Sequence, residues 1–453
     1  MSRTQPAPMT ASTSPLSYGE IVRTWWPLAA SWLLMALEGP AVTAIIARLA
    51  DPEVHLAAYG GLVLPLAFLV EAPIIMLLSA STALSKDWAS YQKIRKFMHV
   101  LGGGLTVLHF LVAFTPLYDV FATGLMGVPP EILEPGRIGL QIVLPWTWSI
   151  AYRRFNQGVL IRAGHSLAVG LGTLIRLAVD GAVLAIGYFL GSVPGIVVAS
   201  AAIVAGVVAE AIYAGIRVRP VLRDTIRPAA AVDPALTLRA FLRFYVPLSL
   251  TSLINLISRP IVSGSLSRMP RAIDSLAAWS VVTSLVFLVR SFGVGYNETV
   301  IALVDRPESL RKLRRFSFVL AGATTLLLLL FAATPLAGFW FGQMTGLSAP
   351  LALLARQSVW LALILPALSV TQSLSQGILL HSKRTRALTE AVFLFLIVDA
   401  GLLAIGVTWG KAPGLFVGVA ALSIGEALRN VWLNLRSRPA RKALLAGETA
   451  APS

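Results

Sequence analysis

The sequence predicts an all-α membrane protein, with about twelve transmembrane helices in two six-helix lobes related by a pseudo-twofold axis along the membrane normal. Three observations predict this fold: the composition, the one-sided placement of the cations and an internal repeat. Of the 453 residues, 56% are hydrophobic and 13% are charged, whereas soluble domains carry about a quarter charged residues. The composition therefore excludes a soluble enzyme, a fibrous protein and a disordered chain.

The apolar residues are gathered in long runs that match the thickness of a bilayer. A helical span needs about 20 apolar residues, and a helix satisfies its own backbone hydrogen bonds in lipid. No run shows the alternation of a barrel strand. We place twelve spans at 24–48, 57–84, 97–118, 135–156, 166–189, 193–216, 242–267, 275–303, 316–340, 350–380, 388–408 and 412–434.

The cations lie mostly on one side of these spans. Of the 37 Lys and Arg, 27 fall in the two tails and in alternate loops, and the segment 153–162, with Arg153 and Arg154, counts as one of these basic loops. Because basic loops stay in the cytoplasm, we expect an integral protein of the plasma (inner) membrane with both termini cytoplasmic. The net charge of +16 then needs no nucleic-acid partner.

An internal repeat relates the two halves of the chain at an offset of about 220 and then 219. Arg48 matches Arg268, Val179-Asp180 matches Val398-Asp399, and Pro194-Gly195 matches Pro413-Gly414. Each half has six spans, so both halves enter the membrane from the same side. We divide the chain into an N-terminal tail (1–23), a first lobe (24–217), a linker (218–241), a second lobe (242–435) and a C-terminal tail (436–453).

Parallel repeats of this kind predict a transporter. Such proteins bind their substrate between the halves near mid-membrane and alternate by rocking. The sequence contains no cysteine, its five His are scattered, and it has neither a Walker-type phosphate loop nor an HExxH motif. We therefore expect no enzyme, no cofactor and no metal site, and we expect a gradient to drive any active transport.

Charges inside the spans indicate candidate functional residues, because a charge at mid-bilayer costs about 2.5–3.5 kcal/mol. Arg176 and Asp180 are four residues apart on a helix, and Glu426 and Arg429 are three apart, so both pairs can form locally. Asp399 is the repeat equivalent of Asp180 and has no neighbouring cation. We expect Asp399 to titrate, and we name both aspartates as candidates for ion coupling.

Four other intramembrane charges have no local partner. Glu38 and Glu71 lie in spans 1 and 2, and Arg259 and Arg290 lie in the equivalent spans 7 and 8. We infer that these helices line the space between the lobes. Two interpretations stay open: inter-lobe salt bridges that hold one closed state, or a substrate site. In the second, the arginines bind an anion and the glutamates gate the site or carry a coupling cation.

Further candidates lie beside these charges. Pro40 and Pro260 are mid-span prolines at equivalent positions, which predicts helix kinks at the cavity wall. Ser258 and Asn297 are added as candidate substrate-binding residues, and Glu298 as a gating or coupling residue at the mouth of span 8.

Two parallel halves of six spans resemble the MATE and polysaccharide-flippase (MOP) superfamily. The run Ile257-Ser258-Arg259-Pro260-Ile261-Val262, followed by Ser267-Arg268, resembles the signature of the progressive ankylosis (ANK) family. Glu38 with the run 56–60, and Glu298 with the run 302–305, resemble two further patches of that family. The animal members carry a long acidic C-terminal tail, whereas this tail is short and basic.

The resemblance implies export of a small polyanion such as citrate, a nucleotide or a pyrophosphate source, with Arg259 as an anion ligand and Glu38 as a lining or gating residue. We therefore expect a monomeric secondary transporter whose partners are a small anion, a coupling cation (H⁺ or Na⁺) and membrane lipid. The alternatives are a cation-coupled multidrug exporter that uses Glu38, Glu71 or Asp399, and a lipid-linked saccharide flippase.

Overall fold

The computed structural model describes residues 16–304, 307–382, 384 and 386–446, and its regular segments are all helices. The first fifteen residues of the predicted N-terminal tail, the last seven of the C-terminal tail and Asp305 of the ANK-like patch lie outside the described residues.

The described residues of the first half form ten α-helices and four short helices of other types. They are α1 (Tyr18–Ile46), α2 (Pro52–Ala58), η1 (Tyr59–Val63), α3 (Leu64–Ile75), α4 (Leu77–Leu84), α5 (Trp88–Phe114), α6 (Leu117–Asp119), η2 (Val120–Leu125), η3 (Pro130–Ile132), α7 (Leu133–Ile142), α8 (Leu144–Arg162), α9 (Ser166–Leu190), α10 (Gly195–Val221) and η4 (Leu222–Ile226).

The second half repeats this order of helices. They are α11 (Leu238–Leu256), α12 (Ser258–Leu266), α13 (Ala272–Val294), α14 (Tyr296–Leu303), α15 (Pro307–Ala333), α16 (Leu336–Gly338), η5 (Phe339–Met344), α17 (Ala349–Val359), η6 (Trp360–Ala362), α18 (Leu365–His381), α19 (Arg386–Trp409) and α20 (Gly414–Ala446).

Among the described residues, eleven helical segments are long and apolar enough to cross a membrane. The predicted span at 135–156 is α7 and α8, which meet at Val143. With these two helices the protein has the two six-helix halves that the sequence predicts, so the predicted fold class is confirmed. Some lengths differ: the helix predicted to end near 434 continues to Ala446.

One part of the cation assignment is wrong. Arg153 and Arg154 do not lie in a loop, because α8 continues to Arg162. Arg153 is only 5% exposed, and Arg154 lines a cavity between the halves. The segment that follows the two arginines contains the buried amides Asn156 and Gln157 as well as the apolar residues Val159 and Leu160, and it extends the span beyond the predicted end at 156.

The repeat is visible in the irregularities of the helices. The second span breaks between α3 and α4 at Met76, and the eighth breaks between α13 and α14 at Gly295. The two breaks are 219 residues apart, which matches the offset of the repeat. Likewise, the π-helices η2 and η5 occupy equivalent places, since both follow a three-residue helix at the end of the third span of their half. The two halves thus share these two local distortions.

The prolines of the first and seventh spans have different surroundings. Pro260 lies in the first turn of α12, just after α11 ends at Leu256, so the seventh span is interrupted beside it. Pro40 lies within α1, which continues to Ile46.

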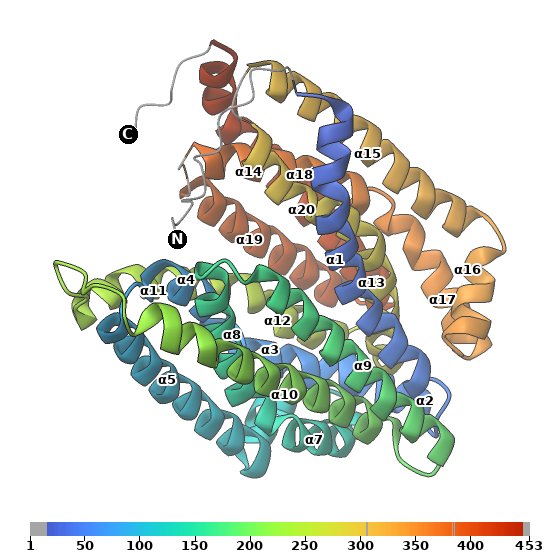
Figure 1. The fold of residues 1–453 in the computed structure, drawn as a ribbon. Helices are drawn as coiled ribbons and strands as arrows, with labels where there is room; N and C mark the ends of the chain where they lie inside the picture. The colour runs from blue at the N-terminus through green and yellow to red at the C-terminus, as the bar shows by residue number, and fades with distance from the viewer. Residues whose placement is uncertain (1–15, 305–306, 383, 385, 447–453) are drawn as a thin grey trace.

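The first helix of each half packs against the other half. Figure 1 shows α1 running alongside α13, α14 and α15 of the second half, and α11 packs in the same way against α3. The Trp25 indole Nε1 donates a hydrogen bond to the Phe292 carbonyl (2.9 Å), and the Tyr245 hydroxyl donates to the Pro73 carbonyl. These two contacts are related by the repeat, so the halves exchange their first helices symmetrically.

Candidate functional site

A cavity of about 540 Å³ lies between the two halves. Its walls come from α1, η1, α3, α8, α9 and α10 of the first half and from α11, α12, α13, α19 and α20 of the second. Six arginines and four carboxylates face it. They are Arg153, Arg154, Arg176, Arg259, Arg290, Arg429, Glu38, Glu71, Asp399 and Glu426.

The glutamate of the first helix is held by an arginine of its own half. Glu38 Oε2 lies 2.6 Å from Arg176 Nη2. Arg176 therefore makes its close ion pair with Glu38, and not with Asp180 one turn further along α9. Asp180 faces both residues at longer range. Glu38, Arg176 and Asp180 form a charged cluster within the first half, which we call the Glu38 cluster.

A carboxylate that does not line the cavity, Glu210, pairs with two arginines of the first half, Arg153 and Arg176. Glu210 of α10, which is 1% exposed, accepts hydrogen bonds from Arg153 and from Gln157 Nε2 (2.9 Å). Its Oε2 also lies 3.9 Å from Arg176 Nε. Arg153 is thereby neutralised inside the first half.

The arginine of the eighth span is also paired within its own half. Arg290 Nη2 lies 2.9 Å from Glu426 Oε1, and Arg429 Nη1 lies 3.6 Å from Glu426 Oε2. Gln372 Nε2 donates a further hydrogen bond to Glu426 (2.7 Å). The predicted local pair of Glu426 and Arg429 is confirmed, with Arg290 as a closer partner.

These pairs bear on the salt-bridge interpretation of the central charges. The ion pairs that the structure gives Glu38 and Arg290 stay within their own halves. Among the described residues, no salt bridge joins Glu38 or Glu71 to Arg259 or Arg290.

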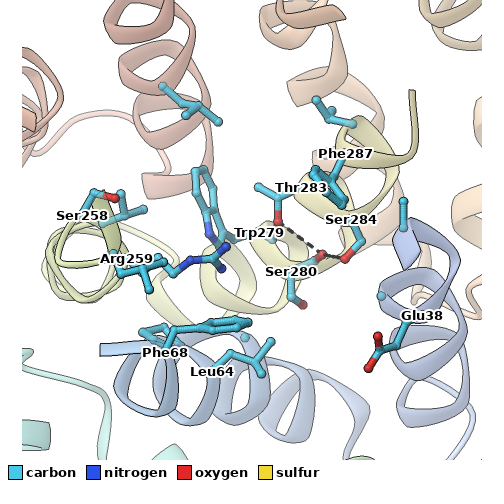
Figure 2. A pocket seen from close by; sticks show the side chains of 18 of the residues that line it. Glu38, Leu64, Phe68, Ser258, Arg259, Trp279, Ser280, Thr283, Ser284 and Phe287 are labelled. Atoms are coloured by element: carbon cyan, nitrogen blue, oxygen red, sulfur yellow. Dashed lines mark hydrogen bonds between the residues drawn. The ribbon is translucent and has the colours of Figure 1, made fainter. Parts of the chain in front are cut away.

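Two arginines reach the cavity without an ion pair in the described part of the chain. Arg259 of α12 places its guanidinium carbon 4.3 Å from the centre of the Phe68 ring of α3, a cation–π contact across the halves. Figure 2 shows this guanidinium beside Trp279 and Phe68. Arg154 of α8 projects from the first half, and its buried Nε has no hydrogen-bond partner.

Two carboxyl groups of the cavity wall also lack close partners. Glu71 is 6% exposed, and the charges that act on it come first from Arg154 and also from Arg259. Asp399 is 1% exposed, and within the described residues neither of its carboxyl oxygens has a hydrogen-bond partner. An unpaired carboxylate is costly in such a place, so both groups are suited to binding a proton or a cation.

The remaining predicted site residues divide into two groups. Ser258 lines the cavity beside Arg259. Asn297 is directed into the second half, where its Nδ2 contacts Gln376 Oε1 at 3.4 Å. Glu298 is exposed on α14 beside Trp32 of α1. Asn297, Glu298 and Asp180 are not among the residues that line the cavity.

Sequence reasoning missed part of the cavity wall. Arg154 falls in the basic segment 153–162, which the sequence assigns to a loop although the predicted span at 135–156 overlaps it. Asn255 also lines the cavity, but the sequence does not single it out, because it is uncharged and lies five residues before the proline of its span. The aromatic lining residues Trp146, Trp279 and Phe287 carry no signal that separates them from ordinary apolar residues of a span.

Comparison with known proteins identifies solved structures that have a similar fold. No protein-family model and no curated protein matches the sequence. Among solved structures, the chain is similar to a multidrug resistance MATE family transporter of the MOP superfamily in an inward-facing conformation, with a TM-score of 0.72 and 16% identity over 93% of this chain and 99% of that one. It is also similar to the lipid II flippase MurJ in an inward closed conformation, with a TM-score of 0.70 and 15% identity over 93% of this chain and 90% of that one.

A third structure is a MOP superfamily transporter from Pyrococcus furiosus, described as having a binding pocket of reverse polarity that suggests a different function. Its TM-score is 0.57 at 16% identity, over 94% of this chain and 96% of that one. Identities this low establish the fold alone. The protein is an integral membrane protein with a MATE-like fold.

Proposed function

We propose that the protein is a secondary-active transporter with alternating access between its two halves, and that it exports a small organic or phosphorylated anion. One observation carries the anion assignment. Arg154 and Arg259, one from each half, reach the central cavity without an ion pair in the described residues, whereas Glu38 and Glu426 are neutralised by arginines of their own halves.

The two arginines are suited to this role by their chemistry. A guanidinium binds carboxylate or phosphate oxygens in a planar, two-pronged arrangement. Because Arg154 belongs to the first half and Arg259 to the second, an anion held by both joins the halves, and its binding favours closure around the substrate. The run that resembles the ANK family supports the same site, since Ser258, Arg259 and Val262 line the cavity.

We further propose that the Glu38 cluster, together with Glu71 and Asp399, binds the coupling cation, H⁺ or Na⁺. Glu210 and Asp180 do not line the cavity, and Glu38 and Glu426 are paired with arginines. The net charge of the cavity wall therefore depends on whether Glu71 and Asp399 are protonated. Neutralising either carboxyl leaves the cavity more cationic and strengthens anion binding. Because cation binding and anion binding then favour each other, coupling of this kind moves both in the same direction, and export draws on the substrate's own gradient.

The alternatives rest on specific observations. Four carboxylates on the cavity wall are compatible with a cation-coupled multidrug exporter of the MATE type. The similarity to MurJ is compatible with a lipid-linked saccharide flippase. We favour the small anion because the cavity of about 540 Å³ is at the lower end of the range for small-molecule sites.

The proposal is tested by thermal-shift measurements on the purified protein. Citrate, nucleotides and pyrophosphate are compared with cationic dyes and a lipid-linked saccharide. A ligand at 100 times its Kd stabilises the folded state by about 2.7 kcal/mol, so we expect polyanions to raise the Tm. The increase should disappear in Arg154→Ala and Arg259→Ala. It should persist in Arg162→Ala, a matched control whose exposed side chain lies at the end of the same helix as Arg154.

Transport in vesicles completes the test. We expect loss of anion efflux or uptake in Arg154→Ala and Arg259→Ala, and a smaller effect in Arg290→Ala, whose side chain is engaged with Glu426. Wild-type transport in both Arg154→Ala and Arg259→Ala contradicts the anion site. Stabilisation by cationic dyes alone, with a pH dependence that disappears in Glu38→Gln, supports the multidrug alternative instead.

We propose a monomer in the plasma (inner) membrane with both termini cytoplasmic. The support is the cation distribution, which stays strongly one-sided after Arg153 and Arg154 are removed from the loops. Because the chain contains no cysteine, single cysteines at exposed Lys86 and Glu131 report the topology directly. An impermeant thiol reagent applied to intact cells should label Glu131→Cys and leave Lys86→Cys unlabelled.

A further inference from the structure

Arg268 spans the two halves at one end of the helical bundle. We call this end the far end. It lies opposite the start of α1 and the end of α20, because both halves enter the membrane from the same side and Arg268 follows the first crossing of its half. Arg268 follows α12, and its Nη2 donates to the Leu125 carbonyl (2.7 Å) while its Nη1 donates to the Met126 carbonyl (3.0 Å). Both acceptors belong to the first half.

Arg48 makes the equivalent contact in the opposite direction. It follows α1 of the first half, and its Nη2 donates to the Gln343 carbonyl of η5 in the second half (2.5 Å). Each arginine also donates from Nη1 to the carbonyl four residues earlier in its own chain segment, Ala44 for Arg48 (2.7 Å) and Gly264 for Arg268 (2.6 Å). Two residues related by the repeat therefore use the same geometry on equivalent loops.

The loops that receive these arginines are built in the same way. Each contains a glycine with positive φ, Gly127 (61°) and Gly346 (69°), at equivalent places after η2 and η5. A Cβ on Gly127 would lie 3.2 Å from Arg268 Cζ, and one on Gly346 would lie 3.2 Å from Arg48 Cγ. Glycine thus supplies both the left-handed backbone and the space for the arginine of the other half.

A third contact adds to this end. The Ser348 hydroxyl of the second half donates to Glu53 Oε1 of the first half (2.7 Å). Arg48, Arg268 and the Ser348–Glu53 pair therefore bind the loops of the two halves to each other at the far end.

We propose that Arg48 and Arg268 form a twofold latch that holds the far end of the transporter closed and that opens when the protein switches to its other conformation. The proposal rests on alternating access between the halves. If the halves rock apart at this end, the hydrogen bonds of both arginines to the opposite loops must break together. Because the two contacts are equivalent, each half carries one donor and one acceptor of the latch.

The latch is tested by measuring the separation of the halves at the far end. The cysteine-free chain permits spin labels at Glu131→Cys and Ala349→Cys, two exposed positions on opposite halves. Pulsed electron–electron double resonance in nanodiscs gives the distribution of distances between the two labels without any substrate. Because each arginine donates charge-assisted hydrogen bonds to the opposite loop, we expect each arginine lost to increase the ratio of long to short distances about tenfold, which corresponds to about 1.4 kcal/mol. Arg48→Ala/Arg268→Ala should increase the ratio further.

The matched control is Arg137→Ala/Arg271→Ala. These two arginines also lie at the far end, but they pair within their own halves, Arg137 with Asp119 (2.7 Å) and Arg271 with Asp274 (2.8 Å). The control should keep the wild-type distances. If the alanine variants do not fold, Arg48→Lys/Arg268→Lys retains both charges but lacks the forked geometry, and the same opening is expected with a smaller change.

An unchanged distance distribution in the folded arginine variants overturns the latch, and so does an equal change in the control. The measurement uses no substrate, so its outcome is independent of whether polyanions bind the central cavity. Failure of the latch and failure of the anion site are therefore distinguished.

Discussion

Glu38 of α1 and Arg176 of α9 form a 2.6 Å ion pair within the first half of the chain. Their side chains are 21% and 10% exposed, respectively, and both face the central cavity. Because α1 also packs against α13 of the second half, this pair attaches the helix that crosses between the halves to its own half. Glu38 is thus a structural partner of Arg176 as well as a candidate for ion coupling.

Removing one member of this pair should destabilise the protein. In Glu38→Ala, the one ion pair that Arg176 keeps within the described part of the chain is with Glu210, at 3.9 Å. Breaking a buried pair costs about 3–5 kcal/mol, and partial exposure of Glu38 lowers this, so we expect a loss of about 2 kcal/mol and a lower Tm in detergent.

The control for this prediction replaces both members. Glu38→Leu/Arg176→Leu removes the charge and its partner together, and such replacements are often neutral. We expect the double variant to recover most of the lost Tm. A double variant that is less stable than Glu38→Ala would show that the pair does not act as a unit.

The sequence was sufficient to predict the helices, the repeat and most of the charged cavity wall. Apolar runs of bilayer length and a constant offset are properties of the chain itself. The intramembrane charges Glu38, Glu71, Arg259, Arg290 and Asp399 all line one cavity, because a charge in a span is tolerated only where it faces protein or water.

The pairing of these charges was not predictable from spacing. Helical spacing suggests Arg176 with Asp180, but Glu38 approaches Arg176 from another helix. Contacts between helices depend on their rotation and crossing, which a single sequence does not define. Arg154 is hidden for a related reason, since two adjacent arginines followed closely by Asn156 and Gln157 are typical of a loop until the polar cavity that receives Arg154 is known.

Asp87 should make the attachment of the linker depend on pH. It is the N-cap of α5, accepting a hydrogen bond from the Ser90 amide (2.9 Å), and it also accepts one from the Val232 amide of the linker (3.0 Å). The Ser90 side chain is the largest of the causes that lower the pKa of Asp87, and the amides of Val232 and Ser90 lower this pKa further. A lowered pKa stabilises the folded state above the ordinary aspartate value of about 3.9, and this stability is lost as the pH falls through the lower folded-state pKa.

Amide hydrogen exchange of the linker measures this contact. At neutral pH we expect Asp87→Ala to speed exchange at Val232 and to cost about 1 kcal/mol as a lost cap. Asp233→Ala, a change at the exposed residue next to Val232, is the control and should leave the exchange of Val232 slow. Equal exchange in Asp87→Ala and the wild type at neutral pH contradicts the prediction.

The two arginines around Glu426 should contribute unequally to stability. Arg290 lies 2.9 Å from this carboxylate and Arg429 lies 3.6 Å from it. Hydrogen bonds to charged groups contribute about 1.5–3 kcal/mol, and only the shorter contact has hydrogen-bond length. We expect a loss of about 2 kcal/mol in Arg290→Ala and about 1 kcal/mol in Arg429→Ala, measured as a change in Tm. A larger loss in Arg429→Ala would reverse the assignment of the main partner.

The packing of η1 against α13 gives the last prediction. A Cβ on Gly60 would collide with the Cβ of Ser280, and it would lie 3.0 Å from Ser280 Oγ. This contact joins the second span of the first half to the eighth span of the chain. Overpacking typically costs about 1–3 kcal/mol, so Gly60→Ala should lower the Tm by forcing the two spans apart.

The partner variant makes this test specific. Ser280→Gly removes the side chain that the new methyl group meets, so Gly60→Ala/Ser280→Gly should be more stable than the sum of the single effects predicts, by about 1–2 kcal/mol. Gly103→Ala is the matched control, since no atom lies within 4 Å of the position of its Cβ. Alanine also favours a helix over glycine by about 1 kcal/mol, so this control should be neutral or stabilising. If Ser280→Gly does not restore stability to Gly60→Ala, the second and eighth spans do not meet at these residues, and the proposed contact between η1 and α13 is contradicted.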